Sequence, residues 1–454
     1  MARLGGLLAV LATALAVGPG GVSGTPASPA ALTLDYRLPP RYGLDANRDG
    51  LVDSITTPAQ VAPTTWTALV NVRWPRGGPC LGTYRWTIDG RPASLVQQRN
   101  SVTRVRTCTF AYSRFGQLAR RYRVNVTATR FGSTGTGRTT VTIEDVLIVG
   151  LGDSTASGEG NPDHGIATVR WQDRRCHRSA RGFEAQAVSR VEAASAKSSV
   201  TFVPLACSGA SITTGLLGPY AGIAPSGGAL LPPQVDAMKE LIGPRRVDAV
   251  LLSVGINDLG FGSVARFCFD DGVGAAQAAA VDCWSKPYPT SSASTTLQAF
   301  VRSRQAALPS GYAQLAAAFQ AASIPASKIY ATEYPIATRD EQGAVCDPLI
   351  PYLDGTPLGF NVRGTITRNE AAQAETELVE PVNAALKDAA AAYGWHLVSG
   401  IASQSTARGV CSTRPWFVDV RQSLIKQHDV RGTLHPNRQG HQAVAGITVS
   451  ALRP

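Results

Sequence analysis

The sequence predicts an α/β domain with a parallel sheet, preceded by a small all-β domain. Residues 30–145 contain short segments in which apolar residues alternate with polar or β-branched ones, as in half-buried strands. Residues 146–454 alternate apolar strand-like runs with Ala- and Leu-rich helical segments, the pattern of a parallel sheet covered on both faces. The charge changes at the same place. Residues 30–145 hold 16 arginines, no lysine and seven acidic residues, whereas 26 basic and 25 acidic residues follow.

Residues 1–24 are expected to be a signal peptide. One arginine precedes a run of 14 apolar or small residues from Leu4 to Val17, and small residues continue toward residue 31. The run is too short to span a bilayer as a helix and suits the core of a secretory signal. We expect cleavage between Gly24 and Ala31 and a secreted, extracellular protein. A helical membrane anchor is the alternative interpretation.

The eight cysteines are expected to form disulfides, because their number is even and export exposes them to an oxidising environment. No Cys-x-x-Cys pair occurs, so the sequence does not support a zinc or thioredoxin-like site of that kind. Many pairings are open. Our hypothesis joins neighbours along the chain, namely Cys80–Cys108, Cys176–Cys207, Cys268–Cys283 and Cys346–Cys411.

Residues 30–145 are expected to form an immunoglobulin-like sandwich. Five or more strand-like segments are separated by turn signals such as Asp89–Gly90. The segments YRWTIDG and FGQLARRYRVNVTA resemble PKD-type and related modules of secreted bacterial enzymes. The arginine excess favours either an anionic cell-surface polymer or membrane surface as partner, or a charged spacer without a partner. No nucleic-acid motif occurs, so nucleic acid is not expected as a partner.

The stretch LDANRDGLVDS has the spacing of a calcium loop. Asp45, Asn47, Asp49 and Asp53 fall at positions 1, 3, 5 and 9 of such a loop, and Gly50 fits the sharp turn at position 6. Position 12 is Thr56 instead of the bidentate glutamate. The expectation is therefore a structural calcium site, with a solvated turn rich in side-chain–backbone hydrogen bonds as the alternative.

The second region contains five strand-like runs, at residues 145–153, 199–207, 247–255, 328–335 and 395–400. In a doubly wound sheet, ligands bind beyond the carboxyl ends of the strands. Chemically useful residues follow these ends: Ser154 in GDS, Gly209 in CSGAS and Asn257 in GIND. His435 in HPN lies before the last helical segment.

These residues suit acyl transfer. A serine hydroxyl needs a base to become a nucleophile, and His435 is the candidate base for Ser154. The oxyanion of the tetrahedral intermediate needs fixed N–H donors. The backbone N–H groups of Ser154 and Gly209 and the side-chain amide of Asn257 are the candidates.

The blocks GDSTASGEG, CSGAS, GIND and HPN, in this order, resemble those of SGNH (GDSL-type) hydrolases, and most of all those of secreted actinobacterial esterases and lipases. The resemblance covers residues 145–454. It implies a flavodoxin-like three-layer fold, Ser154 as nucleophile, His435 as base, Gly209 and Asn257 as oxyanion donors, and no cofactor for catalysis. It also implies three disulfides arranged as in our pairing. The GxSxG elbow of ordinary α/β-hydrolases is absent.

One position departs from the family pattern. The aspartate expected three residues before the histidine is replaced by Gly432. Some relatives use a backbone carbonyl instead, and we expect the carbonyl of Gly432 to accept from the imidazole Nδ1–H. Asp429 or another carboxylate is the alternative. His441 is expected on the solvated side of the last helix.

The sequence therefore predicts a monomeric, secreted carboxylic-ester hydrolase that acts on acyl lipids or small esters. A polysaccharide O-acetylesterase or acyltransferase would use the same residues. A non-catalytic protein that binds anionic surfaces through residues 30–145 is the alternative from another class.

Overall fold

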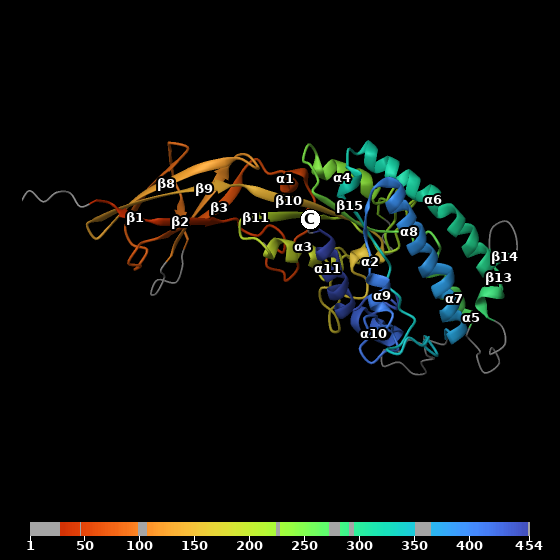
Figure 1. Cartoon of the computed structure of the whole chain (residues 1–454). Helices are drawn as coiled ribbons and strands as arrows, with labels where there is room; N and C mark the ends of the chain where they lie inside the picture. The colour runs from red at the N-terminus through yellow and green to blue at the C-terminus, as the bar shows by residue number, and fades with distance from the viewer. Residues whose placement is uncertain are drawn as a thin grey trace, which may run out of the picture.

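The computed structural model describes residues 28–45, 47–98, 107–223, 228–271, 282–289, 295–349 and 365–452. Figure 1 shows an antiparallel β region on one side and an α/β domain on the other. The expected signal peptide, residues 1–24, lies outside the described residues. Within the part of the chain that the structure describes, no helix is both long and apolar enough to cross a membrane.

The N-terminal β region is built from two sheets. Their facing side chains, Trp86, Phe110 and Val124 among them, form one buried cluster. The first sheet has the order β1 (Ala30–Ala31), β9 (Ser133–Thr142), β8 (Arg121–Arg130), β4 (Thr83–Ile88) and β5 (Arg91–Ala93). The second has the order β2 (Thr33–Arg37), β3 (Trp66–Arg73), β7 (Cys108–Phe115) and β6 (Val96–Gln97). All these pairings are antiparallel except β1 with β9.

A buried ion cluster joins the β region to the α/β domain. The Asp145 carboxylate is fully buried and receives a hydrogen bond of 2.6 Å from Arg245, with Arg41 3.7 Å away. Both guanidinium groups also lie over the ring of Trp66. The chain passes from β9, which ends at Thr142, into β10 (Glu144–Gly152) with one residue between them. The short connection and the buried charges hold the two parts together.

The expected calcium loop lies against the α/β domain. The carboxylate of Asp45 accepts from the backbone N–H groups of Asp49 and Gly50, at 3.0 and 2.9 Å. The Asp49 carboxylate lies 3.4 Å from Arg170, which already supplies a positive charge there. Among the described residues, the one group of three ligand-type side chains close enough to share an ion is elsewhere, at Asp282, Cys283 and Glu370. Calcium binding therefore stays a prediction.

The α/β domain has a five-stranded parallel sheet. Its order is β11 (Ser198–Pro204), β10, β12 (Ala249–Ser253), β15 (Ile329–Thr332) and β16 (His396–Val398). Numbered along the chain within this domain, the order is 2-1-3-4-5, with the first strand between the second and third. The strands are runs of buried apolar residues, as expected for a sheet covered on both faces. The sequence prediction of a parallel α/β domain after a β region is confirmed.

Helices cover both faces of this sheet (Figure 1). Leu147, Val149 and Leu151 of β10 pack toward α4 (Gln234–Ile242), α6 (Leu297–Ala321) and α8 (Glu380–Tyr393). On the opposite face, Ile148 and its neighbours pack toward α3 (Phe183–Ala193), and α11 (Arg438–Leu452) packs beside α3. The remaining elements are α1 (Pro58–Val61), α2 (Ser154–Ser157), α5 (Phe261–Asp271), η1 (Cys283–Ser285), β13 (Pro287–Tyr288), β14 (Thr295–Thr296), η2 (Ala326–Lys328), α7 (Arg368–Ala374), the π-helix η3 (Glu375–Val379), α9 (Ile401–Ser405) and α10 (Val420–Gln427).

Candidate active site

The turn after β10 presents Ser154 at the carboxyl edge of the sheet. Gly152 has φ of +144°, and a Cβ there would lie 2.1 Å from the carbonyl oxygen of Ser253, so only glycine fits this approach. Asp153 then caps the one-turn helix α2, with its carboxylate accepting from the N–H of Thr155 at 2.9 Å. These local constraints fix the backbone on both sides of Ser154, which is a buried residue.

His435 comes to this hydroxyl from a loop near the C-terminus of the chain, directly before α11. Its Nε2 lies 2.7 Å from Ser154 Oγ, although the two residues are 281 positions apart in the sequence. Asn437 fixes the histidine loop, because its Oδ1 accepts from the first N–H groups of α11 and its Nδ2 donates to Pro415 O. The structure therefore brings together the two residues that we expected, from the sequence, to be the nucleophile and the base.

The acceptor for the second imidazole nitrogen differs from our expectation. His435 Nδ1 lies 3.2 Å from the carbonyl oxygen of Thr433. The carbonyl of Gly432 instead accepts the backbone N–H of His435 in a tight turn, at 3.0 Å. Leu434 takes a left-handed φ of +63°, and this turn presents the carbonyl of Thr433 to the ring. A backbone carbonyl is thus the acceptor, but it belongs to Thr433 and not to Gly432.

Asp429, the alternative partner, points elsewhere. Its carboxylate accepts from the side chain of Gln427 and from the backbone N–H of Arg431. Burial lowers the pKa of His435, and the nearby charge of Glu159 and the Thr433 carbonyl offset only part of that effect. A neutral imidazole whose Nδ1–H is held by a carbonyl leaves Nε2 free to accept the serine proton.

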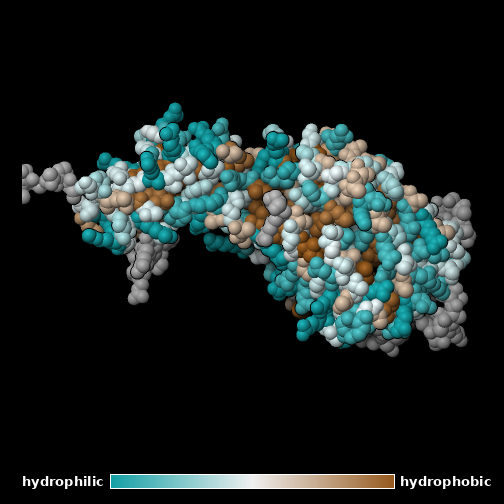
Figure 2. Space-filling view, viewed as in Figure 1, coloured by the Kyte–Doolittle hydropathy of each residue, from teal (hydrophilic) through white to brown (hydrophobic). Residues whose placement is uncertain are grey.

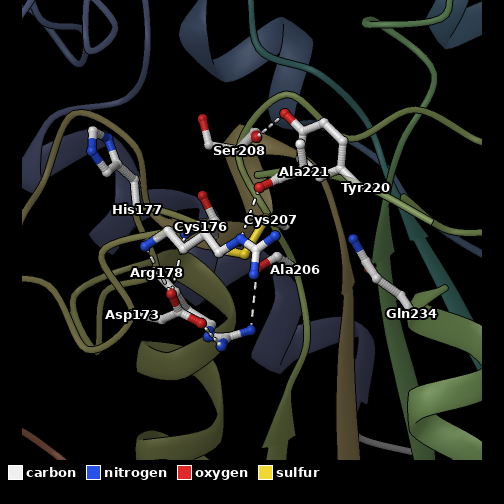
Figure 3. Close-up of a disulfide and its surroundings, with 12 residues drawn as sticks. Asp173, Cys176, His177, Arg178, Ala206, Cys207, Ser208, Tyr220, Ala221 and Gln234 are labelled. Atoms are coloured by element: carbon white, nitrogen blue, oxygen red, sulfur yellow. Dashed lines mark hydrogen bonds and ion pairs between the residues drawn. A yellow bond between two sulfur atoms is a disulfide. The ribbon is translucent and has the colours of Figure 1, made fainter. Parts of the chain in front are cut away.

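The Gly209 loop and Asn257 lie side by side. The side-chain amide of Asn257 donates to the carbonyl oxygen of Ala210 at 2.9 Å, which leaves its second N–H unused in this contact. Gly209 has φ of +82°, and a Cβ there would lie 2.3 Å from the hydroxyl of Tyr220. That hydroxyl donates to Ser208 O at 2.9 Å (Figure 3). Gly209 and Asn257 are thus linked through Ala210, and their role as oxyanion donors stays a prediction.

Each cysteine pairs with its neighbour along the chain, in the bonds Cys80–Cys108, Cys176–Cys207, Cys268–Cys283 and Cys346–Cys411. Figure 3 shows the second of these directly beside Ser208 and the loop that carries Arg178. That bond therefore braces the Gly209 loop against the segment after α2. Because the Cys283 sulfur is used in a disulfide, the group of Asp282, Cys283 and Glu370 is not a metal site.

A buried carboxylate that our sequence reasoning left unassigned joins these loops. Glu159 accepts from His177 Nδ1 at 3.0 Å, from Ser208 Oγ at 2.6 Å and from Gln427 Nε2 at 2.7 Å. Burial alone would raise the pKa of Glu159, but the hydrogen bond and charge of His177, with smaller contributions from His435 and Ser208, hold it below its usual value. The signal was its place five residues after Ser154, in SGEG.

His441 corrects another expectation. Its side chain is fully buried and not solvated, and its Nε2 lies 3.2 Å from the carbonyl oxygen of Glu159. Burial lowers the pKa of His441 to about 4. The neutral ring packs behind the site and holds the backbone of Glu159.

An apolar pocket of about 70 Å³ opens beside the Ser154–His435 pair. Its wall includes Ile256, Phe261, Leu349, Ala374, Leu378 and Leu434. The π-helix η3 supplies part of this wall, and π-helical turns are frequent at functional sites. Glu375 anchors η3 from behind, because it accepts from Thr338 at 2.5 Å and from Arg339 at 2.9 Å. The reacting hydroxyl thus adjoins a small, mostly apolar space.

A serine hydroxyl hydrogen-bonded to a neutral imidazole, at the carboxyl edge of a parallel sheet, is the arrangement that serine hydrolases use. The model of the GDSL-like lipase/acylhydrolase family matches residues 151–443. The chain belongs to this family, and the family implies ester hydrolase activity.

Other comparisons add little. No curated protein sequence matches the chain. One similar solved structure is a carbohydrate esterase, described for the divergent catalytic and non-catalytic binding functions of its active site. It is 11% identical, covers 93% of this chain and 98% of its own, and has a TM-score of 0.30, a likeness too weak to indicate the substrate.

Proposed function

We propose that the protein is a secreted serine ester hydrolase in which Ser154 is the nucleophile and His435 the general base. The observation that carries this proposal is the distance of 2.7 Å between Ser154 Oγ and His435 Nε2, within a chain of the GDSL-like family. The predicted leader and the four disulfides support export.

In this mechanism Ser154 Oγ attacks the ester carbonyl carbon while its proton moves to His435 Nε2. The Thr433 carbonyl holds Nδ1–H and so keeps the ring in the productive tautomer. The N–H groups of Ser154 and Gly209 and the amide of Asn257 stabilise the oxyanion. The imidazolium then protonates the leaving alkoxide, and a water molecule, deprotonated by the same ring, hydrolyses the acyl-enzyme.

The pocket favours an aliphatic acyl group over acetate. Its wall near Ser154 and His435 is mostly apolar, and each methylene that enters it gains about 0.8 kcal/mol by leaving water. The esterase or lipase function is therefore the first candidate, and a polysaccharide O-acetylesterase or acyltransferase is the second.

Hydrolysis of nitrophenyl esters from acetate to palmitate tests the proposal. Ser154→Ala is expected to abolish turnover of every ester while the melting temperature stays close to that of the wild type. Ser450→Ala, an exposed serine on α11, is the matched control and should keep full activity. Unchanged hydrolysis by Ser154→Ala would end the proposal, and release of acetate alone would favour the second candidate.

We also infer finer fold assignments for both parts. The strand order β2-β3-β7-β6 facing β1-β9-β8-β4-β5 supports an immunoglobulin-like sandwich, in which β2, β3, β7 and β6 correspond to strands A, B, E and D. The order 2-1-3-4-5 with helices on both faces supports a flavodoxin-like three-layer domain.

A further inference from the structure

One outer face of the β region is made of arginine and threonine. Along β8, Tyr122, Val124, Val126 and Ala128 point into the core, so Arg123, Asn125 and Thr127 point outward. The strand pairing places Thr140, Arg138 and Thr136 of β9 opposite them, and Thr87 and Arg85 of β4 on the other side. The Arg–Thr face comprises Arg85, Thr87, Arg123, Asn125, Thr127, Thr136, Arg138 and Thr140.

The face is hollowed at one end. A cavity of about 740 Å³, open to solvent, is lined there by Asp89, Gly90, Arg123, Asn125, Arg138 and Thr140. The one acidic residue of this lining is already engaged, because Asp89 accepts from Arg120 at 3.0 Å and from the backbone N–H of Arg123 at 2.9 Å. Figure 2 shows the β region as largely hydrophilic on the side in view. The hollow therefore offers hydrogen-bond donors and positive charge to an incoming group.

The guanidinium groups of this face are not tied into the fold by hydrogen bonds. Elsewhere in the region, arginines are used within the fold: Arg130 donates to Gly77 O at 2.8 Å and lies over Trp74. By contrast, the guanidinium groups of Arg85, Arg123 and Arg138 form no hydrogen bond or ion pair with any residue in the described part of the chain. They stand exposed on three neighbouring strands. The backbone N–H of Arg123 is the main cause that lowers the pKa of Asp89, and the charge of its guanidinium group adds a smaller effect. All three guanidinium groups remain accessible to a ligand.

We propose that the Arg–Thr face binds a linear anionic polymer and so holds the hydrolase at a polyanionic surface. Guanidinium groups bind phosphate, sulfate or carboxylate oxygens in pairs of parallel hydrogen bonds, and threonine and asparagine add neutral donors. Outward side chains recur about every 7 Å along a strand and about every 5 Å across strands, a spacing suited to a polymer with one charge per unit. The face has no apolar side chain that could enter a bilayer, so a polymer fits it better than a lipid surface.

The test uses the full chain on immobilised long-chain polyphosphate and polygalacturonate, with neutral dextran as blank. The triple variant carries Arg85→Thr, Arg123→Thr and Arg138→Thr. Threonine is β-branched and favours strands, so the substitutions remove the charges without disfavouring the sheet. The matched control removes three charges from the α/β domain by Lys239→Gln, Arg246→Gln and Lys387→Gln. The wild type should bind at low salt, the triple variant at least about tenfold more weakly, and the control variant like the wild type.

The salt dependence sharpens the result. Each lost contact should reduce the slope of log affinity against log salt by about 1. All three proteins should hydrolyse a soluble nitrophenyl ester equally, which separates this proposal from the proposed function. Anionic phospholipid vesicles serve as a further probe. The proposal is overturned if the wild type binds neither polymer, if both triple variants lose affinity for the polymers to the same extent, or if the wild type binds the vesicles and neither polymer.

Discussion

Filling the apolar pocket should change which esters the enzyme prefers. Ala374 lines this pocket at the end of α7, directly before the π-helix. A phenylalanine there places a ring where the acyl chain would extend. If the pocket of about 70 Å³ takes two methylenes, their burial contributes about 1.6 kcal/mol. The wild type should therefore prefer butyrate or longer esters over acetate by about 15-fold in kcat/KM.

Ala374→Phe is expected to reduce that preference to near 1 while acetate hydrolysis stays within about threefold of the wild type. The assay is kcat/KM for nitrophenyl acetate, butyrate and octanoate at fixed pH. Ala391→Phe, at an exposed position of α8, controls for adding a ring to a helix. If Ala374→Phe keeps the wild-type preference for longer chains, the acyl group does not enter this pocket and the reasoning is wrong.

Three further outcomes are expected. Glu159→Gln should shift the acidic limb of the kcat/KM profile to lower pH, because a negative charge that raises the pKa of His435 is lost, and Glu159→Asp should restore part of the shift. His441 should lower the free energy of unfolding by about 3 kcal/mol between pH 6.5 and 4, because its pKa is about 4 when folded and the unfolded chain binds the proton first. The carboxyls of Asp153 and Asp258, whose pKa values burial raises to about 7 and about 6, act in the opposite direction, so the loss is measured in urea titrations as the difference between the wild type and His441→Gln at the two pH values. Replacing Cys176 and Cys207 with alanine should cost about 3–4 kcal/mol of stability, measured the same way, because the bond closes a loop of 31 residues.

The sheet and the placement of Ser154 and Asn257 at one of its edges were predictable, because the carboxyl ends of parallel strands lie at the same edge. Ser154 follows the first strand of the domain, and Asn257 follows the third strand along the chain. These two strands are neighbours in the sheet, so their carboxyl ends carry the two residues to one edge. The fold rule needs only the order of strands and the residues at their ends, and both can be read from the sequence.

The acceptor on the imidazole was not predictable in the same way. The choice between Gly432 and Thr433 depends on the left-handed backbone of Leu434, a conformation that a leucine adopts only when surrounding contacts impose it. Here Leu434 N–H donates to Val418 O, from a segment outside the loop. A sequence motif records residue types within one segment, so the hydrogen bond between Leu434 and Val418 cannot be read from it.

His441 shows a signal that was present and misinterpreted. The buried residues of α11 recur as Gly440, His441, Val444, Ala445, Thr448 and Val449, which is the helical period of one face. The period alone places His441 inside. A histidine is polar, but a neutral imidazole with one backbone partner can be buried at the expense of its basicity.

The burial of Glu159 and the carbonyl partner of His435 belong to one electrostatic arrangement. A carbonyl can orient the imidazole but carries no full charge to offset the imidazolium that forms when Ser154 loses its proton. In a buried site that charge would be costly without an anion nearby. Glu159 is an anion whose charge raises the pKa of His435, and its three hydrogen-bond donors come from the His177 loop, the residue before Gly209 and the end of α10. The carboxylate can therefore stabilise the reacting pair without touching it, and it braces the same loops that position the nucleophile, the base and the oxyanion donor.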